Sequence, residues 1–167
     1  MKELEEHPEP PPPSRPPTTP VEETTPQHLL PHTDLGNAER LVGRHGDDLR
    51  YCHAWKGWLI WDGLRWKPDD SGAIFRRIAE TVRSIYAEAS QVDSKDGRKA
   101  KIKWAQSSES RRAMTAMEEL GRNLKGIPVA VEDLDADHYK MTCSNGTVQL
   151  ITGELLKPDR TDLITRM

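Results

Sequence analysis

The 167-residue sequence has little cysteine and no long apolar run. Its two cysteines, Cys52 and Cys143, lie far apart and form no CxxC pair. This spacing argues against a disulfide framework or a zinc ribbon and is typical of a reducing compartment. No stretch of about 18 apolar residues is present, and the N-terminus lacks the apolar core of a signal peptide. These absences predict a soluble, cytoplasmic protein without a membrane partner.

Nucleotide-binding and catalytic motifs are absent as well. A phosphate-binding loop requires GxxxxGK[ST], in which glycine amides surround the phosphates and the lysine reaches the terminal ones. The nearest match, Gly121–Gly126, is followed by Ile127-Pro128 and comes after a helix instead of a strand, so we interpret it as a helix end. No Ser/His/Asp or Cys/His arrangement can be singled out from spacing. We therefore expect no ATPase activity in this chain and find no motif that supports an independent enzyme.

Two sets of potential metal ligands depart from the patterns that metals require. Three aspartates alternate as at the start of a calcium loop: Asp133, Asp135 and Asp137. The loop also needs Gly and Glu where His138 and Ser144 stand, so we interpret the segment as an acidic turn that caps and terminates. The second set comprises His45, Cys52, His53 and Cys143. Its spacing matches no common zinc site, and we predict no metal or other cofactor in this chain.

Proline and acidic residues are concentrated at the N-terminus. Ten of the 13 prolines lie in residues 1–31, and residues 1–33 carry two basic and six acidic side chains. Residues 1–32 cannot bury much apolar surface and are predicted to form a disordered arm with polyproline II character. Pro13–Pro16 matches a PxxP ligand with Arg15 as a specificity charge. A simple tether is the favoured interpretation, because such matches arise freely in proline-rich tracts.

Four of the five tryptophans lie in the stretch Trp55–Trp66. Asp62-Gly63 separates two apolar runs within it, which predicts a hairpin with a two-residue turn. Such a turn pairs Trp61 with Leu64 and Leu59 with Trp66, and places all four on one face. The other face then carries four residues: Trp58, Ile60, Arg65 and Lys67. We expect the first face to be core, and the second to be covered by a helix or a partner subunit.

The hydrophobic periodicity predicts an α+β fold in which antiparallel β hairpins flank a central set of about three helices. A capped helix spans 33–46 and a three-stranded antiparallel meander spans 49–67. Asp70-Ser71 is expected to cap a helix that ends near residue 93, followed by helices at about 98–106 and 107–121. The last of these should bury Ala113, Met114, Met117 and Leu120. A second hairpin is predicted around Asn145-Gly146, with a further strand at 154–156.

Residues 76–125 form a basic middle segment with twelve basic and seven acidic side chains. Eight residues in it are candidates for nucleic-acid binding: Lys95, Arg98, Lys99, Lys101, Lys103, Trp104, Arg111 and Arg112. Basic groups beside an aromatic ring supply the charge and the stacking that single-stranded nucleic acid requires. The alternative is a solvated helix face with Trp104 as its anchor in the core.

Taken together, the motifs resemble those of a known family. The segments TDLGNAERLVGRHGDDLRY, WLIWDGLRW, DLDAD, NGTVQL, TGEL and DLIT resemble the domain that precedes the motor in phage, plasmid and poxvirus primase-helicases of superfamily 3. Order and spacing agree along Thr33–Thr165, although Ala73–Lys125 matches only in helical character. The resemblance implies a DNA replication protein in which a primase part precedes this domain and a hexameric helicase follows it. It assigns ATP and Mg to the parent helicase and no catalytic residue to this domain.

We therefore expect residues 33–167 to be a helicase-preceding domain that stops before any ATPase motor, either as a fragment or as a remnant. Its expected role is that of an accessory or connector domain, which supports motor assembly and contacts DNA non-specifically. The expected partners are DNA and the helicase motor, in cis or in neighbouring subunits. The alternative is a purely structural protein-interaction module, or a remnant that does not bind DNA.

Overall fold

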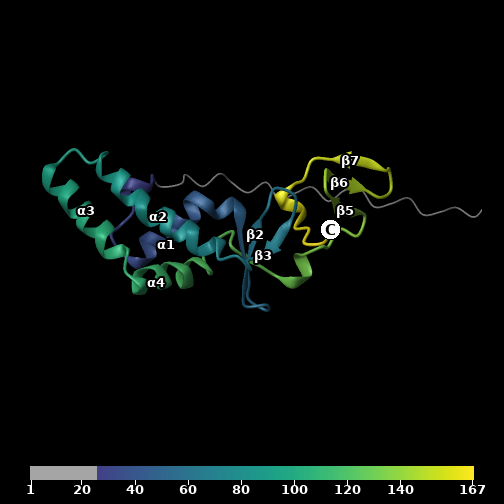
Figure 1. Cartoon of the computed structure of the whole chain (residues 1–167), viewed down its shortest axis with the longest axis horizontal. Helices are drawn as coiled ribbons and strands as arrows, with labels where there is room; N and C mark the ends of the chain where they lie inside the picture. The colour runs from purple at the N-terminus through teal and green to yellow at the C-terminus, as the bar shows by residue number, and fades with distance from the viewer. Residues whose placement is uncertain (1–25) are drawn as a thin grey trace, which may run out of the picture.

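The computed structural model of the chain describes residues 26–167 (Figure 1). The PxxP motif at Pro13–Pro16 and most of the predicted arm lie outside these residues. Residues 26–32, which we had assigned to the arm, pack against the helices and include a short 3-10 helix at Gln27–Leu29. The folded domain therefore begins earlier than predicted, because Arg40 and Lys101 bind backbone carbonyls of this segment.

Four α-helices of the described chain lie towards one end of an elongated molecule (Figure 1). They are α1 (Asp34–His45), α2 (Ala73–Ala89), α3 (Lys95–Ser108) and α4 (Arg111–Gly121). The predicted cap of α1 is confirmed, since Thr33 Oγ1 accepts a hydrogen bond of 3.0 Å from the amide of Gly36. The segment Gly121–Gly126, interpreted from the sequence as a helix end, indeed begins at the last residue of α4.

The cap of α2 differs from the prediction. Asp69, and not Asp70-Ser71, accepts hydrogen bonds from the amides of Ala73 at 2.8 Å and Ile74 at 2.9 Å. Gly72 has a φ of 70°, a left-handed conformation that brings the Asp69 carboxylate under the first turn of the helix. Burial acts to raise the pKa of Asp69, but the hydrogen bonds from Ile74, Ala73 and Ser71 outweigh it and lower the pKa below its ordinary value.

A four-stranded sheet lies beside the helices, with the strand order β3-β2-β1-β4. Its strands are β1 (Leu49–Cys52), β2 (Gly57–Trp61), β3 (Trp66–Pro68) and β4 (Pro128–Val129). The first three form the predicted antiparallel meander, and β4 joins β1 in parallel.

The turn of the tryptophan hairpin is longer than predicted. Trp61 pairs with Trp66 and not with Leu64, which leaves a four-residue connection. The carboxylate of Asp62 closes this connection by accepting hydrogen bonds of 2.9 Å from the amides of both Leu64 and Arg65. Because the register moves by two residues, the alternation is kept, and Leu59, Trp61 and Trp66 still share one face.

The sheet separates two hydrophobic clusters. On one face, Tyr51 and Trp58 pack against residues of the helices, including Leu41, Ile78 and Met117. The second face of the hairpin is thus covered by helices, one of the two alternatives that we expected. On the opposite face, which carries Trp66, a smaller cluster contains residues from the chain after β4 and is formed by Cys52, Leu59, Trp66, Val129 and Leu134. Both faces of the meander are therefore covered by the chain itself.

A three-stranded antiparallel sheet lies towards the other end of the molecule (Figure 1). Its strands are β5 (Lys140–Cys143), β6 (Gly146–Gln149) and β7 (Glu154–Leu156), which confirms the predicted second hairpin. Cys143 pairs with Gly146, so the turn residues are Ser144-Asn145, one position before the predicted pair. A Cβ atom at Gly146 would lie 2.6 Å from the carbonyl oxygen of Leu156. Glycine at this position therefore allows β7 to approach the backbone of β6 closely.

Candidate nucleic-acid interface

Three lysines form a row along the exposed side of α3. Lys95, Lys99 and Lys103 follow one another at intervals of four residues, so their side chains lie on one face, with about 6 Å of helix rise between neighbours. All three are exposed, and none has an ion-pair partner among residues 26–167. Like charges at this spacing destabilise a helix by about 0.2–0.5 kcal/mol per pair. The row is therefore a feature that helix stability alone does not favour.

Three further predicted residues are also exposed, one on α3 and two on α4. Arg98 is exposed on α3, and its guanidinium donates a hydrogen bond of 3.2 Å to the carbonyl of Asp93. Arg111 and Arg112 are exposed in the first turn of α4, directly after the turn that follows α3. Cations at a helix N-terminus oppose the helix dipole, and this first turn holds no acidic side chain. We call Lys95, Arg98, Lys99, Lys103, Arg111 and Arg112 the α3–α4 basic surface.

The other two predicted residues do not belong to that surface. Lys101 is buried, and its Nζ donates to Glu88 Oε2 at 3.0 Å and to the carbonyl of His28 at 2.7 Å. Trp104 is half-buried and stacks on His32 with ring centroids 5.9 Å apart. Its indole N–H donates to Asn37 Oδ1 at 3.1 Å. These contacts correct the expectation that Lys101 and Trp104 face DNA: both attach α3 to the rest of the domain.

A buried ionic network lies beneath α3. Arg40 of α1 has no exposed surface and donates from Nε to both carboxylate oxygens of Glu88, at 3.0 and 3.2 Å. Its remaining N–H groups bind the carbonyls of Gln27, Leu30 and Pro31. Glu88 thus accepts from two cations, Arg40 and Lys101, and joins α1, α2 and α3 to residues 26–32. Burial, followed by the positive charges of Lys101 and Arg40, lowers the pKa of His32, while the negative charge of Glu88 acts in the opposite direction.

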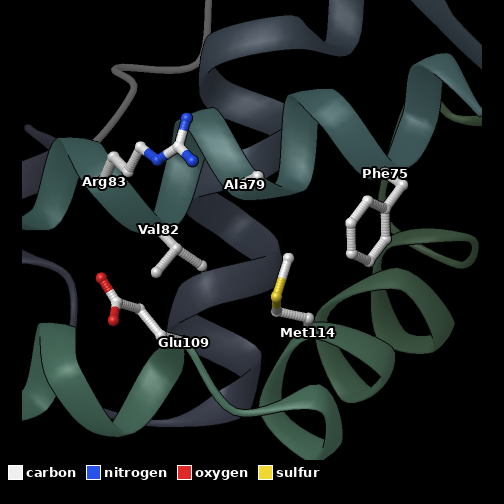
Figure 2. Close-up of a pocket in the computed structure, with 6 residues that line it drawn as sticks. All are labelled: Phe75, Ala79, Val82, Arg83, Glu109 and Met114. Carbon is white, nitrogen blue, oxygen red and sulfur yellow. The ribbon is translucent and has the colours of Figure 1, made fainter.

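An open groove runs between α2 and α4 (Figure 2). Its volume is about 340 Å³, and its lining is mainly apolar. Phe75, the single phenylalanine of the chain, is 58% exposed and lies beside Met114 at one end. Arg83 and Glu109 lie at the other end, from α2 and from the turn before α4 (Figure 2). Leu120, predicted to be buried by α4, is 38% exposed at the end of this helix, whereas Ala113 and Met117 are buried.

The acidic segment after β4 has a structural role. Asp135 accepts hydrogen bonds from the amide of Thr165 at 2.8 Å and from its hydroxyl at 2.5 Å, which holds the last described residues in place. Asp137 accepts from the amide of Tyr139 at 2.9 Å, directly before β5. Across residues 26–167, no three His, Cys, Asp or Glu side chains come together in an arrangement suited to a metal ion. Both carboxylates thus cap backbone amides, as interpreted from the sequence.

One exposed aromatic residue, Trp55, is not among the binding residues predicted from the sequence. The turn between β1 and β2, His53–Lys56, is exposed throughout, and its Trp55 is 48% exposed. The sequence places Trp55 in the tryptophan-rich stretch Trp55–Trp66. A glycine directly after Trp55-Lys56, at the expected turn, is the signal that could have set this tryptophan apart.

Comparison with known proteins identifies the family. Residues 38–167 match the family model described as D5 N terminal like. No curated protein sequence matches the chain. Among residues 26–167, no helix combines the length and apolarity needed to cross a lipid bilayer. Since the match covers most of the chain and both sheets, the protein belongs to the D5 N terminal like family, the N-terminal domain of phage and viral superfamily 3 primase-helicase proteins.

Proposed function

We propose that this domain is an accessory module in DNA replication that contacts DNA non-specifically through the α3–α4 basic surface. The match to the D5 N terminal like family supports this proposal, since helicases and primases act on DNA. The proposed ligand contact is with phosphates, because lysine and arginine supply charge without reading base sequence. ATP, Mg and helicase chemistry are assigned to the motor of the parent protein and not to these residues.

The row Lys95–Lys99–Lys103 is the observation that carries this proposal. Four lysines occur between residues 95 and 103, and they differ in exposure and in ion pairing. Lys101 is neutralised by Glu88, whereas the other three are exposed and have no carboxylate partner in the described part of the chain. A helix that neutralises its inward lysine and leaves an outward row uncompensated has the charge distribution of a phosphate-binding surface.

Charge reversal on this row should weaken DNA binding. The double variant Lys99→Glu/Lys103→Glu is expected to bind a labelled single-stranded oligonucleotide about 10-fold more weakly than the wild type, or worse, because it replaces two phosphate contacts by repulsion. Fluorescence anisotropy at low salt measures this loss.

The matched control is Lys67→Glu/Lys157→Glu, which changes the net charge equally at two exposed lysines outside the helices. It should bind almost as well as the wild type. Equal losses for the two double variants would mean that only the total charge matters, and unchanged binding by Lys99→Glu/Lys103→Glu would remove the proposed surface.

A second candidate function, subunit docking, is supported by the groove between α2 and α4. Both faces of the meander are covered, so the exposed Phe75 offers a better apolar contact than the meander that we first expected to dock. Arg83 and Glu109 lie together at one end of this groove (Figure 2). A two-fold contact brings the same basic and acidic residue from each side, so we propose that Arg83 of one copy pairs with Glu109 of the other. The groove therefore suits a second copy of the same domain.

Self-association tests this second function. Sedimentation velocity over a range of protein concentrations should show an oligomer that the variant Phe75→Asp loses, because a carboxylate cannot enter an apolar contact without a partner. Phe75 is exposed, so the variant should remain folded by circular dichroism. A wild-type domain that stays monomeric at the highest concentration, or an oligomer that Phe75→Asp keeps, would show that this groove is not a subunit contact.

A further inference from the structure

The turn between β1 and β2 projects from the body of the molecule, below the labels of β2 and β3 in Figure 1. The pair Cys52–Gly57 closes it, and the amide of Lys56 donates to the carbonyl of His53 at 3.2 Å. Lys56 has a φ of 53°, a conformation that a residue with a side chain adopts only when the surrounding turn holds it. The turn is therefore a defined structure that presents Trp55 and Lys56 to solvent.

Trp55 differs from the other four tryptophans in having no internal partner. Three of them donate an indole N–H bond within the domain, namely Trp58, Trp66 and Trp104. Trp61 packs edge-on against Trp66 with ring centroids 5.6 Å apart. Within residues 26–167, Trp55 makes neither a ring contact nor an indole hydrogen bond. Its indole N–H therefore has no partner there, and about half of the side chain is exposed to a ligand.

The hairpin that carries this ring has no acidic side chain: Leu49–Trp61 contains Arg50, His53 and Lys56 but no aspartate or glutamate. Arg50 lies over the ring of Trp66, at 4.7 Å from its centroid, so Lys56 is the cation next to Trp55. Lys56 adjoins Trp55 and is exposed, and it has no ion-pair partner in the described part of the chain. His53 is held by an edge contact with Tyr51, with ring centroids 4.9 Å apart. A free aromatic ring beside a free cation on a defined turn matches the needs of an unpaired base and its phosphate.

We propose that the β1–β2 turn is a stacking site for single-stranded nucleic acid, in which the Trp55 ring stacks on a base and Lys56 contacts the adjacent phosphate. This site rests on the proposed function, since it needs DNA to reach the domain, but it is separate from the α3–α4 basic surface. It adds a preference for single strands, because bases in a duplex are already stacked on one another and a surface indole reaches only exposed ones.

Anisotropy titrations with a labelled oligothymidylate test the site through four variants. Trp55→Ala should weaken binding about 5- to 150-fold, the range that loss of one base–aromatic stack produces. Trp55→Phe keeps an aromatic ring and should bind within a few-fold of the wild type. Lys56→Gln should lower the steepness of the salt dependence by about 0.7, the contribution of one phosphate on a single strand. Tyr139→Ala, which removes another exposed aromatic side chain, is the control and should have no effect.

The results separate this site from the proposed function. If Trp55→Ala binds like the wild type while Lys99→Glu/Lys103→Glu is weakened, the stacking site is wrong, the basic surface stands, and the exposed ring serves another ligand such as a protein. The reverse pattern would support the turn and overturn the basic surface. No binding by the wild-type domain would overturn both. Equal weakening by Trp55→Ala on single-stranded and duplex DNA would contradict stacking as the cause.

Discussion

Replacing Trp66 with alanine is expected to lower the free energy of unfolding by about 3–5 kcal/mol, a large part of the total stability of a small domain. Trp66 is fully buried and lies in the smaller cluster, on the face of the meander opposite the helices. Its indole N–H donates to the carbonyl of Arg160 at 2.9 Å, and its amide donates to that of Ile164 at 2.8 Å. Urea unfolding followed by circular dichroism measures the loss.

Trp61 supplies the comparison for this variant. It is only half-buried, and it packs at the edge of the same cluster. Both tryptophans lie on the face that the sequence predicts to be core, but Trp66 is fully buried and Trp61 is not. Trp61→Ala should therefore destabilise less than Trp66→Ala. A Trp66→Ala domain that loses less than about 1 kcal/mol would mean that the cluster behind the sheet contributes little.

Replacing Glu88 with alanine should release α3 and residues 26–32 from the domain. The variant leaves Arg40 and Lys101 buried without their shared carboxylate, and breaking a buried ion pair from one side costs about 3–5 kcal/mol. The main cluster between the helices and the sheet contains no residue of α3, and Ala105 is the one fully buried apolar residue of this helix, so polar contacts form a large part of its attachment. Hydrogen exchange should show early loss of protection in α3, before the amides of α1 are affected.

Glu88→Gln is the matched control, because it keeps the shape and one acceptor oxygen while removing the negative charge. It should fall between the wild type and Glu88→Ala in stability. Arg40 and Lys101 also bind backbone carbonyls, so part of the network survives in both variants. Wild-type protection of α3 in Glu88→Ala would contradict the view that this network holds the helix.

The sequence predicted the faces of the tryptophan hairpin but not its turn. Leu59 and Trp61 lie in one strand, so alternation alone places them together. Trp66 shares their face because the predicted and the observed registers differ by two residues, an even number. The turn length depends on which amides the Asp62 carboxylate binds, and Asp62-Gly63 is compatible with either length. A carboxylate contact likewise decided the cap of α2, where Asp69 replaced the neighbouring Asp70-Ser71 as the acceptor.

The burial of Lys101 could not be predicted from the sequence either, because it depends on a tertiary contact. Lys99, Lys101 and Lys103 are equivalent in composition, and spacing alone places Lys101 on the side of α3 away from the other two. Whether that side is solvated depends on Glu88, which lies in another helix and belongs to no recognisable motif with Lys101. A lysine is buried only where a partner compensates its charge. Here that partner comes from a different helix, so the sequence of α3 alone does not reveal it. Trp55 could not be separated from Trp58 for the same reason.

The salt dependence of DNA affinity tests most directly whether α3 contacts phosphates. The logarithm of the association constant for a single-stranded oligonucleotide should fall linearly with the logarithm of the salt concentration. Neutralising Lys95, Lys99 and Lys103 together to glutamine should reduce the steepness of that line by about 2, since each phosphate contact on a single strand contributes about 0.7. The same steepness for the variant and the wild type, or a wild-type affinity that does not respond to salt, would contradict the proposed function.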